Sequence, residues 1–263
     1  MAAENSLMSI LKKGILKKED LYDTSYWAYA LRSILASVYL AVGIAISMFT
    51  ADKMNQFVPG LGRFGYGLLF GWGLLILLYM NTELGTSNMM YMTVATHRKL
   101  LTPKKALKIL ATCIGFNFIG AIIVAFLLSQ TSPFLMESRF LVEGTVAKLA
   151  KSPWVLFMDG VFANIIVNIS VFCYLRMKDD AGKLISVAFI MYIFAFFGFE
   201  HVIANFSIFF LSIFTTGGAV EGMTLTSVLM NFLMSGLGNF VGGGLVIGLL
   251  YSWLNEQSDL YVD

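Results

Sequence analysis

The chain has 263 residues, of which 58% are hydrophobic and 13% are charged, and its formal net charge is +2. A water-soluble domain cannot cover its surface with so few charged side chains. Lipid must therefore be the solvent around most side chains of this protein. The chain start shows no basic region followed by a short apolar run and a small-residue cleavage site, so we expect no cleaved signal peptide. Cys113 and Cys173 both lie in apolar runs, and a disulfide framework is not indicated.

Residues 1–29 are predicted to form a cytoplasmic amphipathic arm. The stretch from Ile15 to Tyr29 mixes charges with Tyr26 and Trp27, a composition typical of a helix at the membrane interface. A disordered tail is the alternative for this segment. We expect residues 30–254 to form a transmembrane channel domain and residues 255–263 to form a cytoplasmic tail.

Six apolar segments follow the arm, and crossing ~30 Å of hydrocarbon as a helix takes about 20 residues. They cover residues 30–50, 64–96, 107–130, 154–175, 184–214 and 225–254. The second and fifth segments are too long for one simple span, and they contain Glu83 and Glu200. Non-helical backbone at membrane depth survives only inside the protein or along a cavity, so we expect a half-helix, a loop and another half-helix in each. The fold class is therefore an all-α membrane protein with six transmembrane helices, the second and fifth broken.

The basic side chains orient these spans. An even number of spans puts both termini on one side of the membrane, and the loops on the two sides differ in their content of Lys and Arg. The positive-inside rule then predicts a multi-pass protein of the cell (inner) membrane with both termini in the cytoplasm. The side of the termini carries Lys12, Lys13, Lys17, Lys18, Arg98, Lys99, Lys104, Lys105, Lys108, Arg176, Lys178 and Lys183, whereas the other side carries Lys53, Arg63, Arg139, Lys148 and Lys151.

The two halves of the chain share a pattern of polar residues. Glu83 is followed five residues later by Asn88, and Glu200 is followed five residues later by Asn205. Polar breaks at matching places in two halves are typical of a repeat whose broken helices meet at a transport site. Three spans in each half insert with opposite orientation, which gives an inverted 3+3 repeat. A second matching pair of motifs is Asn117-Phe118-Ile119-Gly120 and Asn239-Phe240-Val241-Gly242.

His201 is the strongest candidate for chemistry, because ionisable side chains inside a membrane are costly and mostly face a pathway. Its reference pKa near 6.5 allows proton exchange at physiological pH, and the alternative is a neutral imidazole that acts only as a hydrogen-bond donor. Thr86 is placed to point its hydroxyl from the first break towards this ring. Lys148 lies in the loop before the fourth span and, from its residue type alone, is interpreted as an ordinary solvated lysine.

Glu83 and Glu200 have two interpretations. Either they carry protons, or each carboxylate accepts hydrogen bonds from the backbone N–H groups that its own break leaves free. The second is favoured because a broken helix leaves several donors unsatisfied. A similar fixing role is predicted for the amides, with Asn239 also a candidate partner of His201, and Asn164 and Asn239 are assigned to the substrate pathway as well. These amides are Asn88, Asn117, Asn164, Asn205 and Asn239.

Enzyme functions find little support. A zinc protease needs several ligands at fixed spacing, and the two histidines of the chain are His97 and His201. The chain has no G-x-S-x-G elbow, no phosphate-binding loop and no dinucleotide fingerprint. A Ser235–His201 dyad fits the spacing, but no other residue supports it. We predict no catalytic residue, no metal, no cofactor and no nucleic-acid partner.

Taken together, these motifs resemble the formate/nitrite transporter family, which includes formate, nitrite and hydrosulfide channels. Gly198-Phe199-Glu200-His201-Val202-Ile203-Ala204-Asn205 is close to the F-E-H-x-x-A-N signature of span five, and Glu83-Leu84-Gly85-Thr86-Ser87 resembles the E-L-F-T-S loop of span two. Gly160-Val161-Phe162-Ala163-Asn164 and the Gly238-Asn239 segment resemble the motifs of spans four and six. The resemblance covers essentially the whole chain.

The resemblance implies an aquaporin-like fold, assembled as a homopentamer in which each protomer has its own pore. It makes His201 the central pore histidine with Thr86 opposite, and it makes Lys148 an outer-vestibule lysine. Gly85 departs from the family, because formate channels carry a bulky aromatic residue there. We therefore expect a wider inner constriction and less strict formate selectivity. The apolar constrictions implied by the resemblance are Phe70, Leu74, Leu84 and Phe194.

These observations together predict passive, proton-linked transport of small monovalent weak-acid anions, namely formate, nitrite, hydrosulfide and also acetate or lactate. The anion is expected to be neutralised near the central histidine, so its partners are a proton and the lipid bilayer. A neutral-solute channel of the water or glycerol type is the main alternative, but the chain lacks paired Asn-Pro-Ala loops. A membrane enzyme or scaffold without transport is the other alternative.

Overall fold

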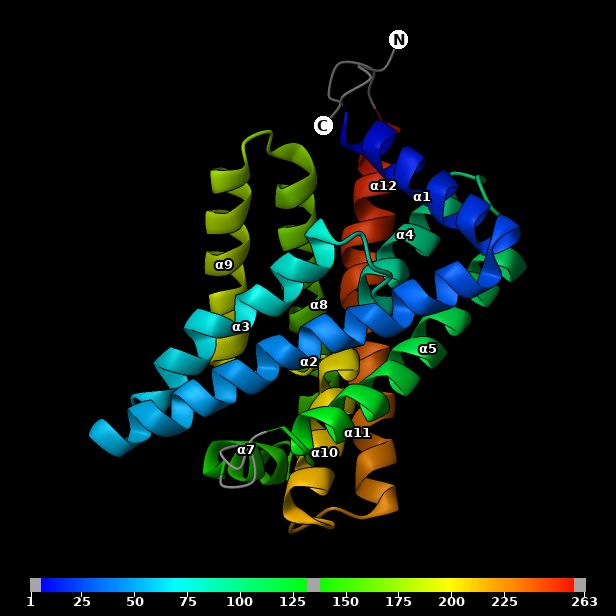
Figure 1. Cartoon of the computed structure of the whole chain (residues 1–263). Coiled ribbons are helices and arrows are strands. Elements are labelled where there is room, and N and C mark those ends of the chain that lie inside the picture. Colours follow the sequence, from blue (N-terminus) through cyan, green and yellow to red (C-terminus); the bar gives the residue numbers. More distant parts are fainter. Residues whose placement is uncertain (1–5, 132–137, 258–263) are drawn as a thin grey trace.

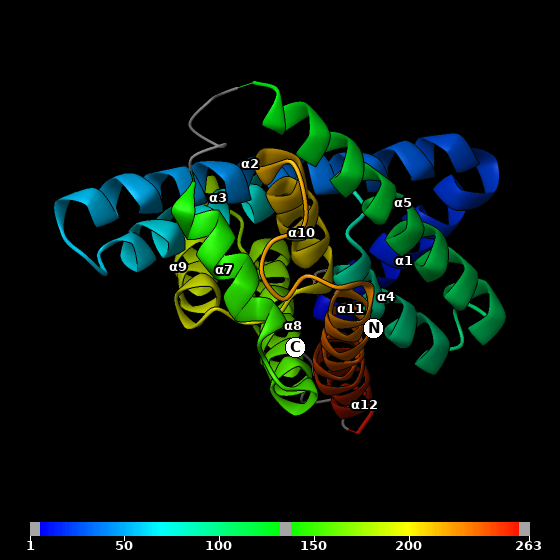
Figure 2. The same ribbon diagram turned by 90° about the horizontal axis from the view of Figure 1, so that it is seen from below.

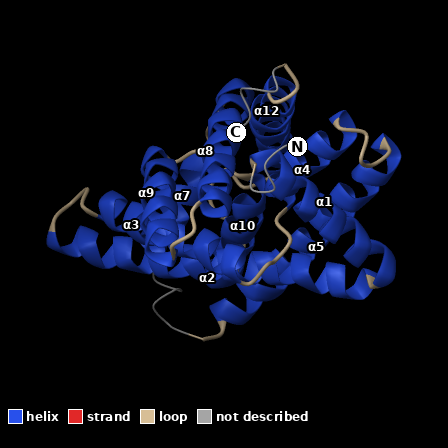
Figure 3. Cartoon of the chain, turned by 90° about the horizontal axis from the view of Figure 1, so that it is seen from above, coloured by secondary structure: helices blue, strands red, loops and turns tan. Residues whose placement is uncertain are grey.

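The computed structural model describes residues 6–131 and 138–257, and every regular element in these ranges is a helix (Figure 3). Six helical segments are long and apolar enough to cross a membrane. They agree with the six predicted spans in order and position, which confirms the predicted all-α membrane fold. These segments are Tyr26–Phe57, Gly62–Tyr79, Pro103–Ser129, Pro153–Arg176, Asp180–Phe197 and Leu225–Leu254.

The arm forms helix α1 (Leu7–Thr24), whose first turn is capped by the side chain of Ser6. Its buried face packs against the membrane helices, so residues 7–24 are helical rather than a disordered tail. Ser25 separates α1 from α2 (Tyr26–Phe57), the longest helix of the described residues. The assignment of residues 1–29 as a cytoplasmic arm stays a prediction.

Both long apolar segments are interrupted at the predicted glutamates. The first consists of α3 (Gly62–Tyr79) and α4 (Gly85–His97), and the second consists of α9 (Asp180–Phe197) and α10 (Val202–Thr216). Glu83 and Glu200 lie in the non-helical links. Gly198 ends α9 at a φ of 70°, a left-handed conformation that glycine adopts without steric cost.

The remaining helices are α5 (Pro103–Ser129), α7 (Arg139–Leu149), α8 (Pro153–Arg176) and a last span made of α11 (Leu225–Asn239), η1 (Phe240–Leu249) and α12 (Leu250–Leu254). The η1 segment is a π-helix, a form that is rare and concentrates at functional sites. α1 and α12 lie at one end of the molecule, whereas α7 and the α10–α11 connection lie at the other (Figures 1 and 2).

Two glycines show that corresponding helices of the two halves approach each other in the same way. A Cβ atom added to Gly120 in α5 would lie 2.6 Å from the carbonyl oxygen of Ile34 in α2, and one added to Gly242 in η1 would collide with the carbonyl oxygen of Val161 in α8. Small residues at such crossings let membrane helices pack backbone to backbone. The third span therefore packs on the first through a glycine, and the sixth span packs on the fourth in the same way.

Replacing Gly120 with alanine is expected to destabilise the protein by about 1–3 kcal/mol, because the new methyl group overlaps backbone that cannot rotate away. Gly115 lies on the same helix with open space around it, so Gly115→Ala is the matched control and is expected to be neutral or stabilising by up to about 1 kcal/mol. The thermal midpoints of the purified variants in detergent measure the difference. Equal midpoints would contradict the close approach of α2 and α5.

Candidate functional site

A buried asparagine holds the first break in place. The Asn117 side chain in α5 donates to the carbonyl oxygens of Glu83 (2.9 Å) and Ser33 (2.6 Å), and it accepts the backbone N–H of Gly85 (2.8 Å). Buried polar groups of a broken helix must find partners inside the protein. Asn117 supplies three of them and joins α2, α5 and the break.

Asn239 makes the same three contacts in the second half. Its amide donates to the carbonyl oxygens of Glu200 (2.9 Å) and Gly160 (2.8 Å), and its side-chain oxygen accepts the backbone N–H of Val202 (2.9 Å). These hydrogen bonds repeat those of Asn117 atom for atom, and the match agrees with the predicted repeat of the two halves. Asn239 contacts the backbone on both sides of His201 and not the imidazole ring.

A further matched pair stabilises each of these asparagines. The hydroxyl of Ser37 in α2 donates to the carbonyl oxygen of Asn117 (2.7 Å), and the amide of Asn164 in α8 donates to the carbonyl oxygen of Asn239 (2.7 Å). Asn164 also donates to the carbonyl oxygen of Thr86 (3.0 Å) and so connects the two breaks. Both amide hydrogens of Asn164 are therefore used on backbone carbonyls.

The two glutamates are fixed by side chains rather than by backbone N–H groups of their own loops. Asn88 donates to Glu83 (2.9 Å), and Asn205 donates to Glu200 (2.7 Å). Each carboxylate also has a cationic partner, which for Glu83 is Lys18 of α1 at 2.6 Å. The prediction that the two carboxylates accept hydrogen bonds from the backbone N–H groups of their own loops is thus wrong. Asn117 and Asn239 bind that backbone instead.

His201 and Thr86 meet at the centre of the molecule. Thr86 Oγ1 lies 2.7 Å from His201 Nε2, and both side chains are buried. His201 Nδ1 accepts the backbone N–H of Ala204 at 3.1 Å and so caps α10. Because Nδ1 accepts, a neutral ring carries its hydrogen on Nε2 and donates to Thr86. Among the described residues, the hydroxyl hydrogen of Thr86 then has no acceptor.

Leu84 occupies the position in the first break that matches His201 in the second. Each directly follows its glutamate and precedes the first residue of the next helix, but α4 has no side-chain cap where His201 caps α10. The central imidazole therefore comes from the second half of the chain only.

Apolar side chains border the His201–Thr86 pair. The rings of Phe70 and Phe194 stack with centroids 5.2 Å apart, and Phe194 also lies edge-on to His201 at 6.1 Å. Leu74 and Leu84 are buried in the same core. The four predicted constriction residues thus share one apolar cluster around the centre.

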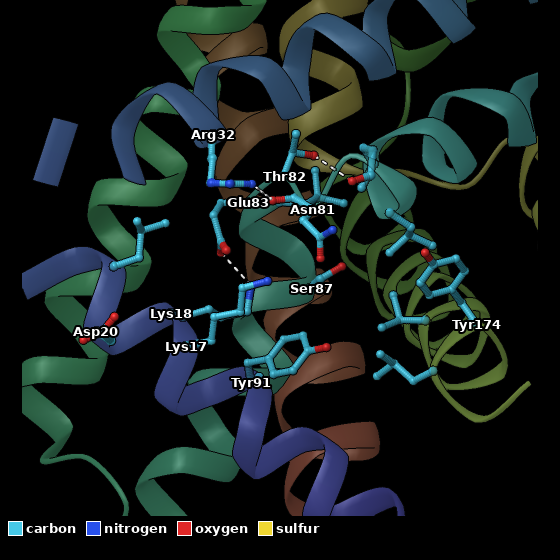
Figure 4. A pocket seen from close by; sticks show the side chains of 17 residues that line it. Lys17, Lys18, Asp20, Arg32, Asn81, Thr82, Glu83, Ser87, Tyr91 and Tyr174 are labelled. Carbon is cyan, nitrogen blue, oxygen red and sulfur yellow. Dashed lines mark hydrogen bonds and ion pairs between the residues drawn. The ribbon is translucent and has the colours of Figure 1, made fainter. Parts of the chain in front are cut away.

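Two cavities lie on opposite sides of this centre. One of about 310 Å³ is lined by Lys18, Glu83 and Leu84 from α1 and the first break (Figure 4). The other, of about 340 Å³, is lined by Lys148, Lys151 and Phe194. We call them the α1 vestibule and the α7 vestibule. Figure 4 shows the ammonium group of Lys18 directed at the Glu83 carboxylate, with Tyr91 below it.

The α7 vestibule contains two lysines that share Glu200. Lys148 lies 3.1 Å from one carboxylate oxygen and Lys151 lies 2.6 Å from the other. Burial lowers the pKa of Lys148 below its ordinary value, although Glu200 acts in the opposite direction. Burial also acts to lower the pKa of Lys151, but its ion pairs with Glu200 and Asp159 outweigh burial and raise it.

Gly85 faces protein rather than open space. A Cβ atom there would lie 2.7 Å from Ile114 and 3.0 Å from the side-chain oxygen of Asn117. A larger residue would therefore press on the asparagine that holds the break. The expected wider constriction stays a prediction.

Sequence reasoning missed Lys18 and Lys151 as members of the site. Lys18 reaches Glu83 from 65 residues away, and the sequence pattern identifies Lys151 only as one of the loop cations. The signal that could have found them is the position of Glu83 and Glu200 inside apolar segments. A charge buried in a membrane protein needs an opposite charge nearby, so each carboxylate indicates a lysine or arginine partner. No group of three or more His, Cys, Asp or Glu is placed to hold a metal ion within residues 6–131 and 138–257.

Comparison with known proteins decides the family. The sequence profile described as formate/nitrite transporter matches residues 8–253. This chain belongs to the formate/nitrite transporter family. The resemblance seen in its motifs is thereby confirmed, and so is the prediction of a transport protein rather than an enzyme, because the family consists of transporters and channels.

Curated relatives match over most of their length. The chain is 29% identical to the uncharacterized transporter YwcJ of Bacillus subtilis, over 97% of this chain and 99% of the relative. It is 29% identical to the nitrite transporter NirC of Escherichia coli, covering 86% and 83%, and 28% identical to the formate-nitrite transporter of Plasmodium falciparum, covering 83% and 74%.

Solved structures show the same fold. An ion channel of this family superposes with a TM-score of 0.86 at 24% identity, over 94% of this chain and 98% of the channel. A pentameric formate channel with formate bound superposes with a TM-score of 0.74 at 20% identity, over 89% and 99%.

Proposed function

We propose that this formate/nitrite transporter family member carries small monovalent weak-acid anions across the cell membrane together with a proton. The observation that supports this most is the buried Thr86–His201 pair, enclosed by apolar side chains and flanked by a lysine-lined vestibule on each side. Related proteins named for nitrite and for formate and nitrite support the substrate class.

An anion at the apolar centre has a large desolvation cost. A bare anion in a low-dielectric constriction costs up to tens of kcal/mol by Born estimates. Protonating a carboxylate of pKa ~4 at pH 7 costs only about 4 kcal/mol, three units of about 1.36 kcal/mol each. Neutralisation therefore wins wherever a proton is accessible. The permeating species is the neutral acid, and the process is passive and independent of ATP.

Each site residue has a part in this scheme. Lys148 attracts the anion in the α7 vestibule, as Lys18 does in the α1 vestibule, and Phe194 and Leu84 strip its water. The rising apolarity increases the proton affinity of the anion. Thr86 then donates a hydrogen bond through its hydroxyl group to the passing acid, without losing its proton, while His201 holds the threonine in position.

The hydrogen bonds of His201 favour water as the source of the proton. Nδ1 already accepts the Ala204 N–H, so a neutral ring offers only its Nε2 hydrogen. Giving that hydrogen away would leave a buried imidazolate, which is far less stable than a protonated small acid. We therefore assign the proton to water in the vestibules.

We also propose that the protein assembles as a homopentamer in the cell membrane, with both termini and the α1 vestibule in the cytoplasm. The fold shared with a pentameric formate channel and the excess of Lys and Arg on the side of the termini support this arrangement. The α7 vestibule then faces outwards.

Proteoliposomes that enclose a pH indicator test the function. Formate, nitrite, hydrosulfide, acetate and lactate are added outside, and entry of the neutral acid is expected to acidify the lumen. The initial rate should rise about tenfold per unit decrease of external pH while the pH stays well above the pKa of the acid. A potassium–valinomycin potential should leave the rate unchanged. A rate that follows the potential rather than the proton gradient would exclude the scheme.

The water or glycerol channel is distinguished in the same vesicles. Such a channel predicts that the vesicles swell in glycerol at a rate that does not depend on pH. It also predicts that the added acids do not acidify the lumen through the protein. If the vesicles showed no flux of any of these solutes, that result would favour a membrane scaffold without transport.

A further inference from the structure

The two carboxylates of the matched breaks differ in their cationic partners. In the part of the chain that the structure describes, Glu83 pairs with Lys18, whereas Glu200 pairs with both Lys148 and Lys151. Glu200 is fully buried, so its charge needs compensation at all times. One lysine would suffice for that purpose, as it does at Glu83.

Lys151 has no donor to spare. Its ammonium group donates to Glu200 Oε1 (2.6 Å), Asp159 Oδ2 (2.7 Å) and the carbonyl oxygen of Gly198 (3.0 Å). A lysine has three N–H bonds, and all three are used. Lys151 is therefore held in place, and it cannot bind an anion without giving up one of these three acceptors.

Lys148, in contrast, has N–H bonds without an acceptor in the described part of the chain. Its ion pair with Glu200 Oε2 at 3.1 Å is its one polar contact among residues 6–131 and 138–257, so two of its N–H bonds remain available. It lines the α7 vestibule together with Phe194, which borders His201. The oxygen it contacts also accepts from Asn205, so Glu200 does not depend on Lys148 alone.

We propose that Lys151 is a positioning residue that neutralises Glu200 and thereby frees Lys148 to hold the incoming anion. The inference rests on the proposed anion transport and names a further residue that sets affinity at one entrance. With Lys151 present, Lys148 can turn from Glu200 to the anion while the buried carboxylate keeps a cation at 2.6 Å. Without it, the anion competes with a fixed carboxylate for the same ammonium group.

The first test replaces Lys151 with methionine, which keeps the length of the side chain and removes its charge. The half-saturation concentration for uptake from the α7 side is expected to rise about tenfold or more, as for the loss of one partner of a buried charge pair. The maximal rate should stay within about twofold, because the central pair is untouched. Uptake from the α1 side, measured in vesicles of the opposite orientation, should keep its wild-type half-saturation concentration. Lys151→Arg should restore most of the affinity.

The decisive variant is Lys151→Met combined with Glu200→Gln. It removes the carboxylate that competes for Lys148, so the half-saturation concentration should return to within about threefold of wild type. If Lys151 only fastened the loop at Gly198, the double variant would be no better than the single one, and that result overturns the proposal. An unchanged half-saturation concentration in Lys151→Met also overturns it.

A second route covers the case in which Lys151→Met does not assemble. Asp159→Asn leaves Glu200 as the one carboxylate that pairs with Lys151 in the described part of the chain, and it changes a side chain that is 24% exposed. The proposal expects a half-saturation concentration at or below wild type on the α7 side, and an increase contradicts it. Absence of acid flux in the wild-type protein would instead contradict the proposed function itself.

Discussion

Replacing His201 with phenylalanine is expected to abolish proton-coupled uptake in proteoliposomes. The phenyl ring keeps the apolar volume but loses both hydrogen bonds, one to Thr86 at 2.7 Å and one from the Ala204 N–H at 3.1 Å. Thr86 then has no partner to orient it, and the neutral acid of the proposed scheme loses its hydrogen-bond donor between the two vestibules. Loss of the helix cap costs a further ~0.5–2 kcal/mol of stability.

Two control variants separate these effects. His201→Asn retains a side chain that caps helices well but is too short to reach Thr86, so we expect a thermal midpoint near wild type and little flux. Thr86→Val keeps the shape and removes the hydroxyl, and it should reduce flux strongly without unfolding. Undiminished acidification by the His201→Phe protein would count decisively against the scheme.

Replacing Asn239 with leucine is expected to have the largest effect on stability. The carbonyl oxygens of Gly160 and Glu200 and the N–H of Val202 all lose their partner inside the membrane-spanning core. Each unsatisfied buried group costs about 1–3 kcal/mol. Three together approach the total stability of an ordinary domain, about 5–15 kcal/mol. We expect little folded protein after size-exclusion chromatography in detergent.

The repeat supplies an internal comparison for this result. Asn117→Leu removes the matching three contacts in the other half and should be about equally damaging. Gln257→Leu changes an exposed amide that donates to the carbonyl oxygen of Trp253, and it should alter stability by no more than about 0.5 kcal/mol. A wild-type melting curve for Asn239→Leu would show that the second break is held by other groups.

The spans and their breaks were readable from the sequence, because hydrocarbon imposes length and apolarity on every crossing helix. The predicted second segment, 64–96, lies within the limits of α3 and α4, and Glu83 and Glu200 were correctly placed in the links. The Asn117 and Asn239 motifs were recognised as a pair, but their backbone partners were not, since hydrogen-bond partners depend on how helices cross.

Long-range charge pairing was the part that sequence reasoning missed. Lys18 lies on a helix outside the apolar segments, and nothing in its neighbourhood indicates that α1 folds back on the first break. Lys151 resembles Lys148 in sequence, three positions away, yet only the fold shows that one is saturated and the other is not. The π-helix of the last span likewise has no pattern that periodicity would detect.

The difference between Leu84 and His201 at otherwise matching positions leaves a single imidazole between the two vestibules. Under the proposed transport, a molecule that enters from either vestibule meets this same ring. Because the proposed process is passive, the acid gradient then sets the net direction, and any difference between uptake and release in affinity must come from the different lysine partners of the two vestibules.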